Sequence, residues 1–341
     1  MTTDIFAIKG YIYPDGVELI KMISKLHAFF VVALFGVVVG SVAAGVVLSS
    51  KGSGEDPTFI TSPPDFVSPG GNITDTPTTG DDTGGVNVPI WWDEFEGTEL
   101  NRDYWKVMTG GNGWGNGEEQ VYVDSPLSLD VSDSQLVITA SKGDDGKYTS
   151  ARIMTKGAWY PGMTLPNGKV TKKIRFESVI TIPEAGQGIW PAFWAFPESS
   201  TYGEFPGSGE IDIMEIINTQ DKLIHGIHYG SAETRVQNMT RTPAPDGTFS
   251  LGTYKFAVDW YSEHMTFFLN DDAANTYYSK SVHKDGWYTD FPGAGPNAPF
   301  DKGFNIILNL AVGGGWPGSP DATTPPTVNM LVEYVRVYAD F

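Results

Sequence analysis

Short segments rich in β-branched and aromatic residues recur from Trp91 to the end of the chain, separated by clusters of Gly, Pro, Asn and Asp. This pattern is typical of β-strands joined by turns. In the run Ile174–Ile182, apolar side chains at alternate positions share one face, as a strand requires. No long segment with the helical period of 3.6 residues occurs in this region. We therefore predict an all-β domain, with two packed antiparallel sheets as the natural architecture. Five further runs are Gln135–Ser141, Tyr254–Tyr261, Met265–Asn270, Phe304–Val312 and Met330–Tyr338.

Charge and composition exclude several classes of partner. The formal net charge is −19, which disfavours nucleic acids and anionic membrane surfaces as ligands. It also disfavours strongly anionic substrates, whereas neutral substrates remain open. The chain has no Cys, which excludes disulfides, thiol catalysis and Cys–zinc sites.

An uncharged apolar segment, residues 28–48, has the length of a membrane-spanning helix, for which about 20 residues suffice. Lys21 and Lys25 precede it, and this basic bias favours a cytoplasmic N-terminal tail at residues 1–27. We expect a single-pass type II membrane protein whose larger part is extracellular or lumenal. The alternatives are a buried core helix and a signal peptide cleaved near Ser41–Ala43, which would give a secreted protein.

Residues 49–88 are rich in Gly, Pro, Ser, Thr and Asp, and they predict a disordered stalk between the anchor and a domain at residues 89–341. Asn72 and Asn238 each begin an N-glycosylation sequon. Together with the apolar segment, the sequons indicate passage through a secretory system.

Three acids, Glu210, Asp212 and Glu215, interrupt an apolar run that is otherwise suited to a protein core. In a regular strand Glu210 and Asp212 share one face and Glu215 takes the other. A one-residue bulge, with Met214 as the extra residue, would bring all three acids to one face. A helix would leave Glu210 and Glu215 about 140° apart.

Crowded carboxyl groups raise one another's pKa, so that one is protonated while another is ionised near neutral pH. Glycoside hydrolysis needs such a pair, about 5–5.5 Å apart in retaining enzymes. A solvated acidic strand face or a metal site would explain the same residues.

The surroundings of the acids resemble a site for oligosaccharides, which need flat apolar faces and polar groups that bind hydroxyls. The segments Gly111–Val123, Gly186–Pro197, Gly226–Gly230 and Asn309–Gly318 supply both kinds of side chain. Trp114, Trp190 and Trp316 stand beside Gly or Pro, which places them at loop tips.

From about Ile90 to Asp340 the chain resembles glycoside hydrolase family 16, nearest to its laminarinase branch of endo-β-1,3-glucanases. The motifs that carry the resemblance are WWDEFEGTELNRDYWKV, NGWGNGEEQVY, TSARIMTKG, GIWPAFWAFP, GEIDIMEI and FNIILNLAVGGGWPG. The resemblance implies a β-jelly-roll sandwich with an open cleft across its concave sheet, and a retaining mechanism.

By position in these motifs, the resemblance assigns Glu210 as the nucleophile, Glu215 as the general acid/base and Asp212 as the residue that tunes both. It places Trp190 and Trp194 on the floor of the cleft. The further substrate-binding residues are expected to be Trp114, Asn116, Glu119, His228 and Trp316. No cofactor is needed for catalysis, but some family members bind a structural calcium, for which Glu94, Gly97 and Asp340 are candidate ligands.

The resemblance predicts a retaining hydrolase of internal β-1,3 or mixed β-1,3/1,4 bonds in β-glucan, acting as a monomer. A transglycosylase would use the same intermediate but transfer it to a sugar hydroxyl. A glucan-binding protein on the same fold would have lost catalytic acids, whereas both Glu210 and Glu215 are present. The acidic charge makes sulfated galactans a less suitable substrate.

Overall fold

The computed structural model describes residues 88–231 and 233–341. The predicted tail, the apolar segment 28–48 and all of the stalk except Val88 lie outside these residues. Within the described part, no helix has the length and apolar character needed to cross a bilayer.

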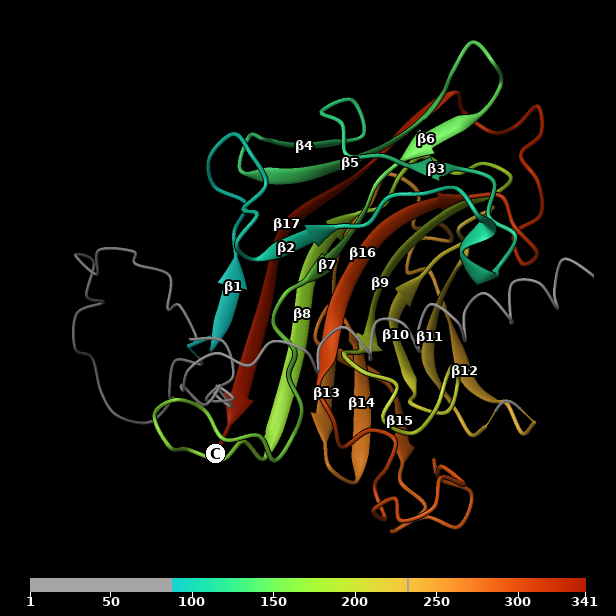
Figure 1. The fold of residues 1–341 in the computed structure, drawn as a ribbon. Coiled ribbons are helices and arrows are strands. Elements are labelled where there is room, and N and C mark those ends of the chain that lie inside the picture. The colour runs from blue at the N-terminus through green and yellow to red at the C-terminus, as the bar shows by residue number, and fades with distance from the viewer. Residues whose placement is uncertain (1–87, 232) are drawn as a thin grey trace, which may run out of the picture. The chain divides into compact units, whose positions relative to one another are not determined.

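The described residues form a sandwich of two β-sheets, as Figure 1 shows. Strand pairing is antiparallel throughout except between β3 and β6, which are parallel. The fold class is thus as predicted, with this one exception. One short 3-10 helix, η1 (Gly113–Gly115), lies in the loop before β3.

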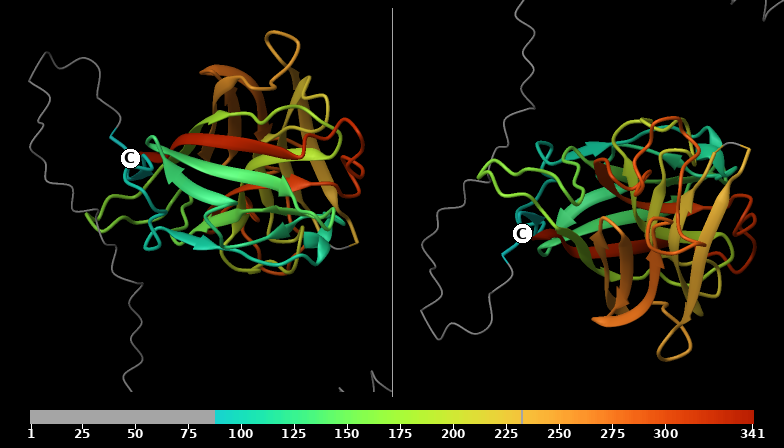
Figure 2. Two further views of the ribbon diagram at one scale, coloured as in Figure 1. Left: turned by 90° about the horizontal axis from the view of Figure 1, so that it is seen from above. Right: turned by 90° about the horizontal axis from the view of Figure 1, so that it is seen from below.

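One sheet has ten strands, and its order brings distant parts of the chain together, because β17 pairs with both β5 and β8. Figure 2 shows β17 in red, seen from above and from below. In spatial order the strands of this sheet are β15 (Asp272–Tyr278), β14 (His264–Leu269), β13 (Thr253–Tyr261), β8 (Lys173–Thr181), β17 (Thr327–Asp340), β5 (Gln135–Lys142), β6 (Tyr148–Ser150) and β3 (Val121–Tyr122), with β1 (Trp91–Asp93) paired to β17 and β4 (Leu129–Ser132) paired to β5.

The other sheet has seven strands, and the acid-rich segment is its third strand from one edge. The order is β12 (Val236–Pro243), β11 (Lys222–Tyr229), β10 (Glu210–Glu215), β9 (Ile189–Pro197), β16 (Phe304–Val312), β7 (Arg152–Thr155) and β2 (Trp105–Val107).

The core lies between the two sheets, because each sheet turns one face of alternating apolar side chains toward the other. Trp260 of β13 and Phe304 of β16 make an edge-to-face contact across the sandwich, with ring centres 5.3 Å apart. Along β16, Ile306, Leu308 and Leu310 belong to this core. The intervening Asn309 therefore points to the outer face of the seven-stranded sheet.

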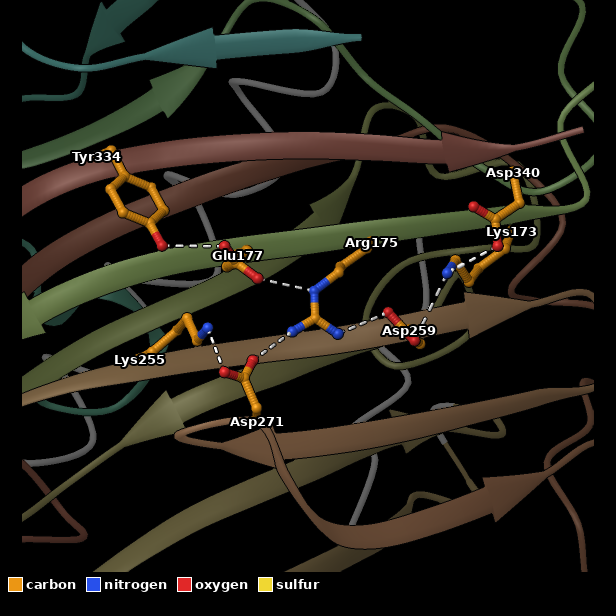
Figure 3. A network of polar contacts seen from close by, with 8 residues as sticks. All are labelled: Lys173, Arg175, Glu177, Lys255, Asp259, Asp271, Tyr334 and Asp340. Carbon is orange, nitrogen blue, oxygen red and sulfur yellow. Dashed lines mark hydrogen bonds and ion pairs between the residues drawn. The ribbon is translucent and has the colours of Figure 1, made fainter. Parts of the chain in front are cut away.

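The outer face of the ten-stranded sheet carries a network of ion pairs, drawn in Figure 3. Arg175 lies at its centre and donates to Glu177 at 2.8 Å and to Asp259 at 3.0 Å. Tyr334 donates its hydroxyl to the second oxygen of Glu177, and Lys173 pairs with Asp340. These contacts tie β8, β13 and β17 together on the side away from the core.

We expect Arg175→Gln to lower the free energy of unfolding by about 3 kcal/mol, because it leaves partly buried carboxylates without their cation. The side chains of Arg175 and Glu177 are only 14% and 9% exposed. Chemical denaturation measures the loss.

The matched control is Arg102→Gln, which breaks an ion pair whose side chains are 55% and 48% exposed. An exposed pair contributes less than about 1 kcal/mol. Equal losses in the two variants would show that burial does not set the strength of the network.

Candidate active site

A bulge in β10 brings the three acids to the outer face of the seven-stranded sheet. Against β11, Asp212 pairs with Gly226 and Glu215 with Ile224, so three steps on β10 match two on its partner. The predicted bulge is therefore confirmed.

The position of the extra residue differs from the prediction. Against β9, Asp212 pairs with Trp194 and Met214 with Phe193, so the residue without a partner is Ile213 rather than Met214. Both side chains are buried in the core. Because Ile213 and Met214 both point into the core, Glu215 returns to the same sheet face as Asp212.

The acids line a cleft of about 620 Å³ that crosses the strands of the sheet. Asp212 is buried, whereas Glu210 and Glu215 are half-buried. His228, the β11 partner of Glu210, places its Nε2 atom 3.3 Å from Asp212 Oδ2 and 3.8 Å from Glu210 Oε1. Glu215 instead accepts a hydrogen bond of 3.1 Å from the Trp190 indole. The two glutamates thus have different neighbours.

Burial raises the pKa of all three carboxyl groups, and their mutual repulsion adds to the effect for both glutamates. The pKa of Glu210 is well above its ordinary value, first because of burial and then because of Asp212. Burial and Asp212 likewise raise the pKa of Glu215, against which the Trp190 hydrogen bond acts. The pKa of Asp212 rises to about 8 through burial. The cluster as a whole therefore retains protons at neutral pH that isolated carboxyls would lose.

Burial lowers the pKa of His228, although the nearby Glu210 opposes the shift. A neutral imidazole beside carboxyl groups has one N–H to donate, and Nε2 is the ring atom that faces Glu210 and Asp212. His228 can therefore stabilise the ionised form of either neighbour without carrying a charge itself.

Tryptophans line the cleft on the β9 side of the acids. Trp190 and Trp194 are both in β9, so Trp190 is not at a loop tip as predicted. Trp114 in η1 and Trp316 after β16 are in loops and also line the cleft, as does Asn116. The Trp190 and Trp316 rings meet edge to face with centres 5.2 Å apart.

The structure does not place Glu119 in the cleft lining, where its neighbour Glu118 lies instead. Glu119 is exposed and does not line the cleft, whereas Glu118 is buried and does. Glu118 accepts hydrogen bonds from Asn116, Gln120 and Tyr122. In NGEEQ the two acids are adjacent, so the motif alone did not identify the one that points inward.

Arg152, the first residue of β7, is a cleft residue that sequence reasoning missed. It is buried, and its guanidinium lies 4.7 Å from the centres of both the Trp114 and Trp194 rings. This arrangement joins the η1 loop to the floor of the cleft by cation–π contacts. Arg152 occurs in TSARIMTKG, a motif that was recognised but from which no site residue was taken.

The β12 side of the cleft was also missed. Its lining residues alternate along the chain as Arg235, Gln237, Met239 and Arg241, with Phe205 beside them. The alternation in RVQNMTR is the signal that could have identified this face.

The candidate calcium ligands Glu94, Gly97 and Asp340 do not line the cleft. Both oxygens of Glu94 accept from Arg336, and Asp340 pairs with Lys173. Gly97 has φ +101°, in a turn after β1. In the part of the chain that the structure describes, the group with metal-ligand spacing is Glu210, Asp212 and His228. The calcium site stays a prediction.

Partly protonated carboxyl groups beside flat aromatic faces are what acid–base cleavage of a glycosidic bond requires. The fold and the site together therefore define a β-sandwich of the carbohydrate-cleaving class. The family model described as "Glycosyl hydrolases family 16" matches residues 128–335, and the chain belongs to this family.

Relatives agree with this assignment. The glucan endo-1,3-β-glucosidase of Cryptopygus antarcticus is 36% identical over 267 residues, which cover 74% of this chain and 92% of that protein. The endo-β-1,3-glucanase structure from Pyrococcus furiosus has a TM-score of 0.61 at 32% identity, covering 74% of this chain and 94% of that one. For the laminarinase of Rhodothermus marinus the TM-score is 0.61 at 30% identity, with 74% and 96% covered. The predicted family resemblance is confirmed.

We expect Asp212→Asn to raise the melting temperature at about pH 9 and to change it little at about pH 4. The pKa of Asp212 in the folded protein, about 8, is above its value in an unfolded chain. Its carboxyl therefore contributes fully to stability only below the unfolded pKa, and that contribution is lost as the pH rises through about 8. An amide has no proton to lose, so the variant avoids this loss.

The control is Asp124→Asn, because the hydrogen bond from Arg102 lowers the pKa of Asp124. Its small effect should have the opposite sign, a loss of stability at high pH. Melting curves of Asp212→Asn that differ from wild type equally at both pH values would rule out a raised pKa.

Proposed function

We propose that residues 89–341 are a retaining endo-glucanase that cleaves internal β-1,3 or mixed β-1,3/1,4 bonds of β-glucan by double displacement. The observation that carries the proposal is the bulge in β10, which turns Glu210 and Glu215 to one cleft on either side of Asp212. An acidic strand face without this function would not need two carboxyls buried in a tryptophan-lined cleft.

Glu210 is the nucleophile in this scheme. Its carboxylate forms a bond to the anomeric carbon, the bond from that carbon to the leaving oxygen breaks, and Glu215 gives its proton to that oxygen. Water then attacks the anomeric carbon, the bond to Glu210 breaks, and Glu215 accepts the proton of the water. Both glutamates return to their starting states.

Asp212 and His228 favour the charge state that the first step needs. With a pKa of about 8, Asp212 holds its proton at neutral pH, so it adds no negative charge beside Glu210. His228 Nε2 lies 3.8 Å from Glu210 Oε1, so an N–H at this nitrogen would stabilise the ionised form of Glu210. The first step needs Glu210 as the ionised group of the cluster, and His228 and Arg152 are the neighbours that act to lower its pKa against burial. Glu215 keeps the proton for the leaving oxygen.

The tryptophans of the β9 side support a sugar-chain substrate, because their faces can stack on the apolar faces of glucose rings. The named activities of the relatives, glucan endo-1,3-β-glucosidase and laminarinase, point to β-1,3-glucan. There are two alternatives to hydrolysis: transfer of the intermediate to a sugar hydroxyl, and glucan binding without catalysis. Analysis of the reaction products distinguishes both from hydrolysis. Attachment to a membrane through residues 28–48 remains a sequence-based proposal.

We expect Glu210→Gln to reduce the release of reducing sugar from laminarin by several orders of magnitude without unfolding the domain, because an amide cannot act as the nucleophile. The matched control is Glu119→Gln, the same change at an exposed acid outside the cleft, which should stay close to wild type. A folded Glu210→Gln protein that keeps more than about a tenth of the activity would exclude Glu210 as nucleophile.

Glu215→Ala should still react with an aryl β-glucoside whose leaving group needs no proton, but its second step should stall. Added azide can then occupy the space of the lost carboxylate and attack the intermediate. We expect a β-glycosyl azide, because two displacements restore the starting configuration. Nuclear magnetic resonance of the product identifies the anomer.

An α-azide would show a single displacement and so an inverting mechanism. If azide does not accelerate the folded variant at all, Glu215 is not the acid/base, and Asp212 becomes the candidate for that role.

A further inference from the structure

The arginines of this chain divide into two groups according to whether they line the cleft. Each of the three outside the cleft is paired with a carboxylate. The three that line the cleft have no carboxylate within ion-pair distance among residues 88–231 and 233–341. The paired arginines are Arg102, Arg175 and Arg336, and the cleft arginines are Arg152, Arg235 and Arg241.

Two of the cleft arginines are accessible to a ligand. Arg152 is buried, and its guanidinium already contacts the Trp114 and Trp194 rings. Arg235 and Arg241 are exposed. They stand just before and within β12, the edge strand of the seven-stranded sheet, which Figure 1 shows beside β11.

Strand register places these two arginines close to the acids. Arg241 pairs with Ile224, and Ile224 pairs with Glu215, so Arg241 lies two strands, or about 10 Å, from the acid/base. The Arg235 guanidinium lies 4.7 Å from the centre of the Phe205 ring, and Phe205 lies against His228. The charge of Arg235 reaches the acids, since it lowers the pKa of Asp212 against the larger effect of burial.

The cleft therefore has two unlike sides. The β9 side presents tryptophans, which suit the faces of neutral sugar rings. The β12 side presents two guanidinium groups that have no carboxylate partner within the described part of the chain, with Gln237 and Met239 between them. A guanidinium donates two parallel hydrogen bonds to a carboxylate or sulfate, a geometry that a neutral sugar hydroxyl cannot match.

The net charge of −19 does not oppose an anion at this position. Exposed charges more than about 8 Å away are largely screened at physiological salt, whereas a group in contact with an arginine is not. The expectation that overall charge disfavours anionic substrates therefore does not extend to the β12 side of the cleft.

We propose that Arg235 and Arg241 form a subsite for an anionic substituent, a sulfate ester or a carboxylate, on the glycan chain that occupies the cleft. The substrate class then includes anionic β-glucans as well as neutral ones. This inference rests on the proposed function in one respect: the glycan chain that bears the anionic substituent is a β-glucan.

The test compares neutral laminarin with laminarin that carries sulfate esters or carboxymethyl groups at matched substitution. For each, kcat/KM is measured with wild type and with the double variant Arg235→Gln/Arg241→Gln. We expect the ratio of anionic to neutral kcat/KM to fall about tenfold in the double variant, because the charge-assisted hydrogen bonds to the substituent are lost. The single variants show which arginine is used, and the two substrates show which anion is preferred.

The control is Arg102→Gln, which removes one arginine charge outside the cleft lining, as each single variant does inside it, and should leave the ratio as in wild type. Rising salt should reduce the ratio in wild type and not in the double variant. If the double variant and Arg102→Gln give the same ratio within about twofold, the subsite does not exist.

Binding measured without turnover separates this inference from the proposed function. Glu210→Gln proteins with and without the arginine changes are run through gels that contain neutral or sulfated laminarin. Retardation by sulfated laminarin that depends on Arg235 and Arg241 supports the subsite even if no glucan is cleaved. Equal retardation of both proteins by sulfated laminarin overturns the subsite, even if the wild-type protein cleaves laminarin.

Discussion

One residue inserted into β10 determines whether the site exists. Without the bulge, Glu215 would face the core and the outer sheet face would hold only Glu210 and Asp212. The bulge is stable because the two consecutive inward residues, Ile213 and Met214, are both apolar and both fill the core. The requirements of packing and of chemistry are thus met by the same six-residue strand.

The remainder of the domain keeps that strand in place. Core contacts such as Trp260 with Phe304 join the two sheets, and the Arg175 network ties strands together on the far side. Carboxyl groups crowded in a cleft destabilise the folded state near neutral pH, because burial penalises their charge. A large core and a cross-linked outer sheet supply the stability that offsets this loss.

Period-two patterns predicted the strands well: Phe304–Val312 coincides with β16, and five other runs differ from their strands by a few residues at the ends. The clustering of the acids and the presence of the bulge were also predicted, because both have a local signature, whereas Met214 as the extra residue and Trp190 at a loop tip were wrong. Which of Glu118 and Glu119 enters the cleft was not, since adjacent residues in a loop have no period that fixes their direction. Arg152 and the β12 arginines were missed because their importance comes from neighbours distant in sequence.

The place of β10 within its sheet makes the cleft unequal about the point of cleavage. Two strands, β11 and β12, lie on one side, or about 10 Å of sheet, while β9, β16 and β7 on the other side provide about 14 Å. A polysaccharide lying across the strands therefore contacts a longer stretch of sheet on the β9 side of β10 than on the β11 side. For the proposed endo-glucanase, this asymmetry predicts room for more sugar residues on the β9 side of the scissile bond than on the β11 side.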